Sequence, residues 1–484
     1  MAAIDIIKTG ETPNAVSRIV GQWRLLLCVL VPIIILLMPV PEGLTPQAWQ
    51  LFALYVGAIL GFILRPLPEP AVLLCVIAIS SITMGNTATV LSGFAHPVVW
   101  LVFSAFMIGT AIFETGLGRR IAYWLIGRVG GSTLSLGYVA AITDLAIAPA
   151  TPSNTARTGG IVFPIIRSIA ASLGSIPGPT SGRVGTYLTV LLYSVSLTTG
   201  YIFLTAISTN VLTLTFAKSI LKTDIDWLLW FKAAALPGFI CLALLPLVVY
   251  FLSPPELKSY DNKEVSREGL AELGPISGRE MLLGLLFLMA ILAWATGSWT
   301  KIEATPVAVA FVAACLLTGV VSWESLSANR SAWSTFVWYG GIVGIADSLA
   351  KAKFFEWLTK ILADTLPLTG YNVIVTLALL VLFCIVLHYV FASLAVFVTA
   401  MMPVLFSLAL AAQLPLYPTI FLVAFATNYG AAVTHYGGAL GPVLFGAGYV
   451  SQRTWWTMGA ILAAMSFVIH MVIGLPYWKW LGLW

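Results

Sequence analysis

The sequence is poor in charge. Only 9% of its 484 residues are Asp, Glu, Lys or Arg, while 60% are hydrophobic and the mean hydropathy is +0.98. A soluble domain carries about 25% charged residues, so the composition excludes a soluble globular protein and predicts an integral membrane protein surrounded by lipid. The net charge of +5 is scattered over short polar stretches, and we therefore expect no nucleic-acid partner.

Metal-binding and hydrolytic signatures are also lacking. The five cysteines all lie in apolar segments and form no CxxC pair, which is typical of small buried side chains. The sequence contains no HExxH motif, no GxSxG motif and no pair of aspartates placed for intramembrane catalysis. We therefore expect neither enzyme activity nor a cofactor.

Long apolar segments are abundant, and each is long enough to cross a hydrocarbon core of about 30 Å. They predict an all-α polytopic fold with about eleven crossings, over residues 24–40, 46–64, 68–84, 96–116, 186–223, 226–252, 280–297, 305–321, 331–350, 417–450 and 454–475. Arginines outside 134–172 fall near one set of loops, which places the N-terminus in the cytoplasm and the C-terminus outside. A bacterial plasma membrane is the expected location.

Two further apolar regions, 134–172 and 371–411, are interrupted near their middle by small or polar residues and predict re-entrant hairpins. Each is followed by a span that is itself interrupted, by "TAISTN" at 205–210 and by "THYGGALGP" at 434–442.

This order predicts two inverted repeats, residues 1–252 and 280–484, joined by a cytoplasmic linker at 253–279. Paired interrupted segments in inverted halves indicate a transport site near the membrane midplane.

The first hairpin tip carries residues suited to a small anion. Half-helix N-termini present free N–H groups and a partial positive charge, and Ser153, Asn154 and Thr155 add neutral hydrogen-bond donors. Arg157 adds a positive charge that either contacts substrate or forms an ion pair with Asp144 on the other arm.

The other candidate binding residues lie at the second tip and the two interruptions. His435 is a candidate substrate contact, whereas His388 is expected to be a structural donor. Glu114 and Asp347 are expected to form interhelical bonds. The remaining candidates are Ser208, Thr209, Asn210, Ser393, Thr434, Gly437 and Gly438.

The stretch "TPSNTARTGGIVFPIIR" closely resembles the first hairpin motif of the divalent anion–sodium symporter family. "FETGLGRRIA", "IFLTA", "FAS" at 391–393 and "FGAGY" at 445–449 are similar to the branch that holds bacterial citrate/succinate and tartrate/succinate antiporters and plastid 2-oxoglutarate/malate translocators. The resemblance extends over essentially the whole chain. It implies a homodimer, an elevator mechanism and di- or tricarboxylate substrates.

In sodium-coupled members of that family both tips read Ser-Asn-Thr and help to form two sodium sites. Here the first tip is intact, but Leu394 and Ala395 follow Ser393 in the second. Two oxygen ligands of a hard cation are thereby lost, and Arg157, with a protonated His435, could replace bound sodium. A fixed charge without a partner would raise the free-energy barrier for the substrate-free site to return across the membrane by about 3 kcal/mol.

The leading hypothesis is a sodium-independent, obligatory antiporter of dicarboxylates such as succinate, malate, 2-oxoglutarate, tartrate or citrate. The alternative is a sodium-coupled symporter that uses one sodium site, because Asn154 and the break at Ser208–Asn210 are retained.

Overall fold

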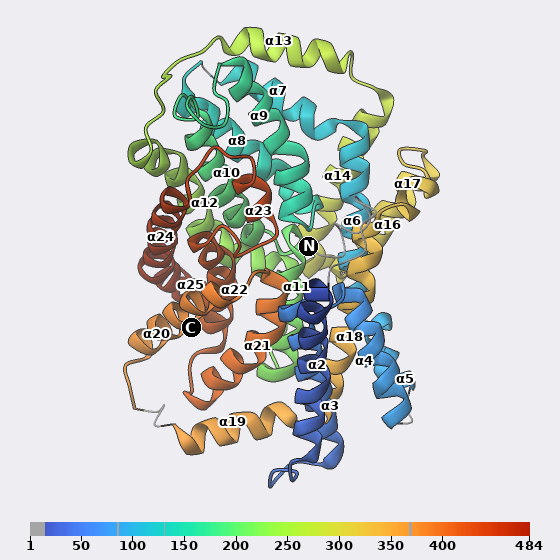
Figure 1. The fold of residues 1–484 in the computed structure, drawn as a ribbon. Coiled ribbons are helices and arrows are strands. Elements are labelled where there is room, and N and C mark those ends of the chain that lie inside the picture. Colours follow the sequence, from blue (N-terminus) through green and yellow to red (C-terminus); the bar gives the residue numbers. More distant parts are fainter. Residues whose placement is uncertain (1–14, 85–86, 130, 367–369) are drawn as a thin grey trace. The chain divides into compact units, whose positions relative to one another are not determined.

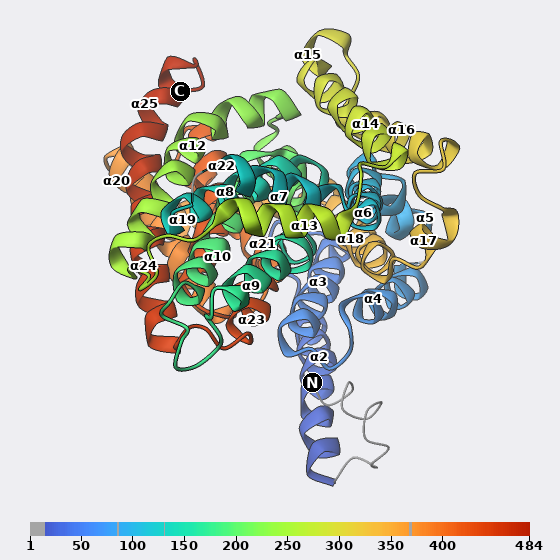
Figure 2. The same cartoon turned by 90° about the horizontal axis from the view of Figure 1, so that it is seen from above.

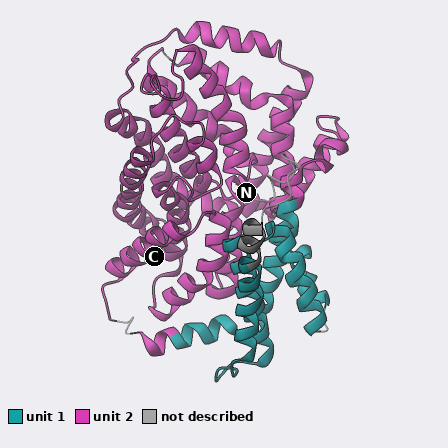
Figure 3. Ribbon diagram, viewed as in Figure 1, with its two compact units in different colours: residues 1–99, 334–361 teal, residues 100–333, 362–484 magenta. Residues whose placement is uncertain are grey.

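The computed structural model describes residues 15–84, 87–129, 131–366 and 370–484 (Figure 1). Within these ranges the regular structure is helical, apart from one isolated bridge between Ser132 and Ser259. The chain divides into two compact units, residues 1–99 with 334–361 and residues 100–333 with 362–484 (Figure 3). Each unit takes residues from both predicted repeats.

The first unit is built from apolar helices that follow one another closely. They are α2 (Ala15–Leu37), α3 (Pro46–Leu64), α4 (Glu69–Met84), α5 (Thr87–Leu91), η1 (Ser92–Ala95), most of α18 (Arg330–Lys351) and most of α19 (Phe354–Thr365). The Thr45 side chain caps α3 by accepting from the Ala48 N–H. A Cβ on Gly93 would lie 2.1 Å from the Gly340 carbonyl oxygen, so only glycine permits this crossing.

The second unit holds every candidate binding residue. Its unbroken helices are α6 (Pro97–Thr115, all but its first turn), α7 (Leu117–Arg128), α12 (Trp227–Leu252), α13 (Asn262–Leu273), α14 (Gly278–Ala295), α15 (Gly297–Thr300), α16 (Ala304–Leu317) and α17 (Trp323–Ser327). Near the C-terminus α24 (Gln452–Ile469) passes through the π-helical turn η7 (His470–Gly474) into α25 (Leu475–Trp480).

Both predicted hairpin regions consist of two helical arms joined by a short non-helical tip. In the first, α8 (Thr133–Ile147) and η2 (Ala148–Ala150) lead to the π-helical turn η3 (Thr155–Val162) and α9 (Phe163–Ser172). In the second, α20 (Val373–Leu387) and η5 (His388–Val390) lead to α21 (Leu394–Ala411). Whether these arms turn back within a membrane stays a prediction.

The two interrupted spans are broken where the sequence indicates. The first runs through α10 (Gly185–Ile202), η4 (Leu204–Ala206) and α11 (Ser208–Leu221), and the second through α22 (Leu416–Gly430), η6 (Ala431–Val433) and α23 (Leu440–Phe445). The tip element η2 packs on η4, and η5 packs on η6, so each hairpin tip meets the break of the span that follows it.

A short sequence repeat accompanies this arrangement. The last turn of the helix before the first break contains Thr199-Gly200-Tyr201, and that of the helix before the second contains Thr427-Asn428-Tyr429. The two helices, α10 and α22, pack directly on each other. Positions 200 and 428 therefore lie at matching places on two neighbouring helices.

Helices occupy all eleven segments predicted to cross the membrane. Among the described residues nine helices are long and apolar enough to cross a membrane: six lie in predicted spans, and three, Thr133–Ala150, Val373–Val390 and Leu394–Ala411, are arms of the predicted hairpins. Three shorter apolar helices, Trp23–Leu37, Glu69–Thr83 and Ala304–Leu317, fall below that length. The polytopic all-α class is confirmed, while the number of crossings stays a prediction.

The predicted linker is an ordered strap. Its helix α13 lies along α7 (Figures 1 and 2), where Ser266 Oγ donates to the Tyr123 carbonyl at 2.8 Å. Before this helix, the Tyr260 N–H donates to the Gly131 carbonyl at 2.7 Å. The strap thus fixes α7 against the base of the first hairpin.

Candidate functional site

The first hairpin tip is held by the break in the first interrupted span. The Ser208 N–H donates to the Pro152 carbonyl at 3.1 Å, and Thr205 Oγ1 donates to the Pro149 carbonyl at 2.6 Å. Proline cannot donate through its own nitrogen, but both carbonyls remain free to accept. The two prolines therefore stop the helix and supply the acceptors that dock the tip.

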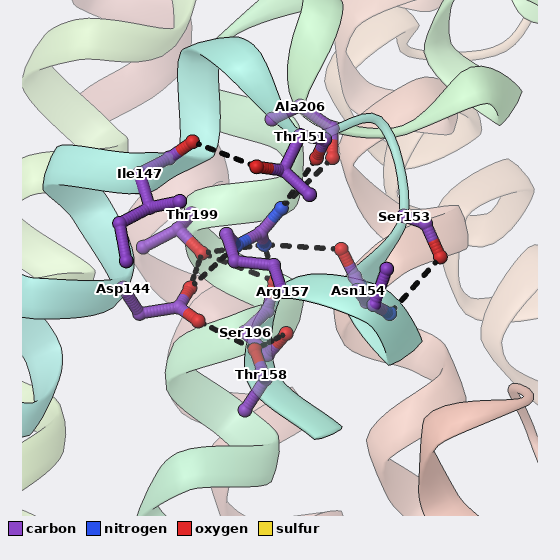
Figure 4. Close-up of polar contacts among 11 residues, drawn as sticks. Asp144, Ile147, Thr151, Ser153, Asn154, Arg157, Thr158, Ser196, Thr199 and Ala206 are labelled. Atoms are coloured by element: carbon purple, nitrogen blue, oxygen red, sulfur yellow. Dashed lines mark hydrogen bonds and ion pairs between the residues drawn. The ribbon is translucent and has the colours of Figure 1, made fainter. Parts of the chain in front are cut away.

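Arg157 lies behind this tip, fully buried, and all its N–H groups have acceptors (Figure 4). Its Nε donates to Asp144 Oδ2 at 3.0 Å, an ion pair in which neither side chain is exposed. The other acceptors are the carbonyls of Thr151 (3.0 Å), Ala206 (2.9 Å) and Ser196 (3.2 Å), Asn154 Oδ1 (3.1 Å) and Thr199 Oγ1 (3.0 Å).

Asp144 is satisfied in the same way. Its Oδ1 accepts from Thr158 Oγ1 at 2.5 Å, and its Oδ2 accepts from Thr199 Oγ1 at 2.5 Å as well as from Arg157. A buried charge is tolerated when it is paired and fully hydrogen-bonded. Of the two alternatives for Arg157, the structure contains the ion pair with Asp144. The expectation of an uncompensated fixed charge is therefore wrong for this conformation.

The polar residues on the open side of the tip are less buried than Arg157. Ser153, Thr155 and Ser208 are each half-buried, and Ser153 Oγ accepts from the Ala156 N–H at 3.3 Å. The helix α11 begins at Ser208, so its first N–H groups lie beside the tip. This side of the tip has the neutral donors expected for an anion, and contact with substrate stays a prediction.

Three buried asparagine side chains gather behind the tip at the ends of α10 and α22. Asn210 Nδ2 donates to the Gly200 carbonyl at 2.7 Å, and Asn428 Nδ2 donates to Asn210 Oδ1 at 3.4 Å and to the Ala424 carbonyl at 3.2 Å. Asn154, the third, lies against Gly200. Asn428 is not among the binding residues predicted from the sequence, although the repeated Thr-Xaa-Tyr at 199–201 and 427–429 is a signal for it.

The second hairpin tip is apolar by comparison. The His388 ring stacks on Phe397 with ring centroids 3.8 Å apart, and its Nδ1 lies 3.4 Å from the Cys384 carbonyl. Leu394 is buried, and Ser393 precedes α21 without capping it through its side chain. Ser393 is half-buried and remains a candidate donor.

The segment 434–440 packs on both hairpins. A Cβ on Gly438 would lie 3.4 Å from Leu394 Cδ1, and one on Gly159 would lie 3.2 Å from Leu440 Cδ1. A Cβ on Gly437 would meet the Ala431 carbonyl oxygen at 2.5 Å, which explains the glycine at that position. The glycines let this segment pass close to both hairpins.

His435 is half-buried and has a fixed tautomer. Trp456 Nε1 donates to His435 Nδ1 at 3.0 Å, so the ring proton lies on Nε2 and the ring is neutral. The ring also lies against Phe445, with centroids 4.4 Å apart. The expectation that a protonated His435 supplies positive charge is not supported by this geometry. Thr434, next to it, is buried.

Glu114 lines a cavity of about 580 Å³ between the end of α6, α9 and the end of α13. The Arg119–Glu272 ion pair, 3.1 Å long, lies at the same cavity. For Glu114 and Asp347 the described part of the chain contains no side-chain hydrogen bond or ion pair, so the interhelical bonds expected of them are not found there.

Comparison with known proteins gives the family. The model of the "Sodium:sulfate symporter transmembrane region" matches residues 20–484. The chain belongs to this family. The resemblance predicted from the first hairpin motif is confirmed, and the chain is a membrane transporter of this family, not an enzyme.

Two relatives and one solved structure cover almost the whole chain. Inner membrane protein YbhI of Escherichia coli is 45% identical over 96% of this chain and 98% of its own length. The L-tartrate/succinate antiporter of Escherichia coli is 34% identical over 94% of this chain and 97% of its own. The crystal structure of the Alcanivorax borkumensis YdaH transporter matches with a TM-score of 0.54 at 12% identity, over 96% and 98% of the two chains, and shows the fold alone.

Proposed function

We propose that the protein exchanges one di- or tricarboxylate for another across the bacterial inner membrane, without sodium. The observation that carries this proposal is the set of oxygens around Arg157. Three carbonyls, an amide oxygen and a hydroxyl converge on its guanidinium at 2.9 to 3.2 Å, beside the Asp144 carboxylate. Such oxygens are the ligands that a hard cation prefers, and a permanently charged side chain occupies them.

The second tip also supports transport without sodium, because its side chains offer few oxygen ligands. The side chains of Leu394 and Ala395 contain no oxygen, and Leu394 packs against Gly438. A cation site there would lack the side-chain ligands that the first tip possesses. The name of the L-tartrate/succinate antiporter, 34% identical, supports both the substrate class and exchange.

The driving force follows from the charges. Asp144 balances Arg157, so the pair contributes no net charge, and the guanidinium occupies the oxygens that a coupling cation would need. With sodium unused, the gradient of a second dicarboxylate would drive uptake, as the name of the L-tartrate/succinate antiporter supports. The half-buried donors of Ser153, Thr155 and Ser208 would bind the carboxylates, with Arg157 holding the tip in shape.

The transport architecture is part of the proposal. Two inverted repeats, residues 1–252 and 280–484, would place the hairpins with opposite orientation, which is supported by the matching contacts η2–η4 and η5–η6. The chain would form a homodimer, move its site by an elevator mechanism and have its N-terminus in the cytoplasm. The inner-membrane location is supported by the name of the relative, inner membrane protein YbhI.

The test is uptake of labelled succinate into proteoliposomes that contain the full chain. Vesicles are either loaded with unlabelled dicarboxylate or left empty, each with sodium or potassium outside. We expect uptake only into loaded vesicles, at the same rate in either salt. Uptake into empty vesicles driven by a sodium gradient would replace the proposal with a sodium symporter.

A further inference from the structure

A groove of about 410 Å³ lies along the second hairpin, away from its tip. On α20 it is lined by Val375, Leu379 and Phe383, whose four-residue spacing places them on one side of the helix over about 12 Å. On α21 it is lined by Ala409 and Ala412, close to the end of that helix. Side chains from both arms thus enclose a single hollow within the second unit.

Small residues and a third helix account for the hollow. Both arms pack on α22 (Figure 1), and the buried side chains of Leu380, Ala409 and Leu414 form the floor of the groove. An alanine carries only a methyl group, so positions 409 and 412 leave unfilled a volume that larger side chains would occupy. Proteins contain few voids larger than a water molecule, so a groove of this size indicates an occupant.

The lining excludes water and ions as the occupant. None of the described residues that line the groove is charged. The Thr376 hydroxyl already donates to the Asn372 carbonyl of its own helix at 3.0 Å. An ordered water needs about two to four polar partners, and an ion buried without partners costs far more. The groove therefore fits an apolar molecule.

The rim of the groove continues into a surface suited to lipid. Val375, Leu379 and Phe383 are between 46% and 61% exposed, and Leu382 and Val386 of the same arm are exposed as well. The segment Val373–Val390 is long and apolar enough to cross a membrane, and the chain belongs to a family of membrane transporters. A hollow that opens into hydrocarbon is filled by it, because an empty hollow loses the dispersion contacts of its lining.

The groove is too small for a second copy of the chain. Eleven residues line it, whereas a stable protein interface takes about 20–30 residues from each partner. We infer that one acyl chain of a membrane phospholipid occupies the groove and joins the two arms of the second hairpin. The glycerol end of the lipid lies at Tyr371, which precedes α20 and is 63% exposed, because tyrosine is enriched where a membrane meets water. This inference depends on neither the substrate nor the coupling ion.

The lipid is recognised through its chain and not through its headgroup. Because the described lining contains no charged side chain, an anionic headgroup gains no ion pair there. Phosphatidylethanolamine and phosphatidylglycerol with the same acyl chains should therefore bind equally well. A lipid that binds only the folded protein raises its unfolding temperature.

The experiment measures thermal unfolding of the delipidated full chain by tryptophan fluorescence, with either lipid added. The detergent has a rigid steroid tail, so that no detergent alkyl chain competes for the groove. We expect both lipids to raise Tm by the same amount, about 2 °C or more. Native mass spectrometry of the unaltered chain should find one tightly held phospholipid per chain.

Ala412→Phe fills the groove with a side chain of the protein itself. We expect the lipid-induced rise in Tm to fall by at least about half, because the lipid loses its site. Val386→Phe is the matched control, since it introduces the same side chain on the same hairpin at an exposed residue outside the groove. The control should keep the full rise. Ala412→Leu makes the same test with a smaller side chain if Ala412→Phe does not fold.

An equal rise in the unaltered chain, Ala412→Phe and Val386→Phe would overturn the inference, since the lipid would then act on the general surface. A rise with phosphatidylglycerol alone would overturn it in favour of a headgroup site. An unaltered chain that retains no phospholipid would overturn it as well. Failure of proteoliposomes to exchange dicarboxylates would instead remove the proposed function and leave this inference standing.

Discussion

The first hairpin tip, residues 151–158, and the second, residues 388–395, occupy corresponding places in the chain but are held by different interactions. The first is stabilised by a buried ion pair and hydrogen bonds that satisfy every donor of Arg157. The second is stabilised by the stacking of His388 on Phe397 and by the burial of Leu394.

The two tips differ in whether directional hydrogen bonds or non-directional apolar contacts hold them. Directional bonds fix the position of each polar group, and a partly satisfied network costs more than an apolar one. Apolar contacts tolerate small changes of shape, because they are not directional. The first tip is thus suited to holding polar groups in one position for binding a substrate. The second tip is suited to packing against a substrate or against adjacent side chains.

The largest expected effect comes from Arg157→Ala. Removing one partner of a buried ion pair leaves an uncompensated charge and costs about 3–5 kcal/mol of stability, so the variant should lose stability as well as transport. Thermal unfolding in detergent, followed by tryptophan fluorescence, measures this loss. The double variant with Asp144→Ala should lose less than the sum of the two single variants. An Arg157→Ala protein as stable as the unaltered chain would show that the pair does not hold the tip.

Arg157→Lys tests whether the planar geometry of the guanidinium group matters in addition to its positive charge. Lysine offers three donors from a single point and cannot reach the set of acceptors that the planar guanidinium serves. Orphaned buried carbonyls cost about 1–3 kcal/mol, so a loss of that size is expected by the same unfolding measurement. A neutral outcome would mean that charge alone suffices.

The double change Leu394→Asn with Ala395→Thr makes the second tip resemble the first. Replacing the buried Leu394 by a polar side chain should cost about 2 kcal/mol of packing. If the missing oxygens are the reason for sodium independence, uptake by this variant should respond to sodium and not to potassium. Uptake that ignores sodium would shift the explanation to Arg157.

The smallest effect is expected for His388→Phe. The change keeps the stacking on Phe397 and loses only a long contact of 3.4 Å to the Cys384 carbonyl. Stability should change by less than about 1 kcal/mol, which the same unfolding experiment detects. A loss comparable to that of Arg157→Ala would show that the second tip depends on a polar contact after all.

The sequence alone determined the class of the protein and the places where its helices break. Low charge and long apolar segments require a membrane. Prolines mark the first tip and glycines the second break, because they disfavour a continuous helix, while small or polar residues mark the second tip and the first break. The first tip motif also sufficed to recognise the family, because Ser153, Asn154 and Thr155 stand in unbroken order.

The tertiary structure decided which partner each polar residue has. Arg157 could reach either substrate or Asp144 from its place in the chain, and only the packing of α8 against η3 places the carboxylate beside its Nε. The Thr-Xaa-Tyr repeat around Asn428 acquires a structural meaning only because α10 and α22 lie side by side. Local sequence specifies where a helix ends, whereas a hydrogen bond between residues far apart in the chain depends on how the whole unit packs.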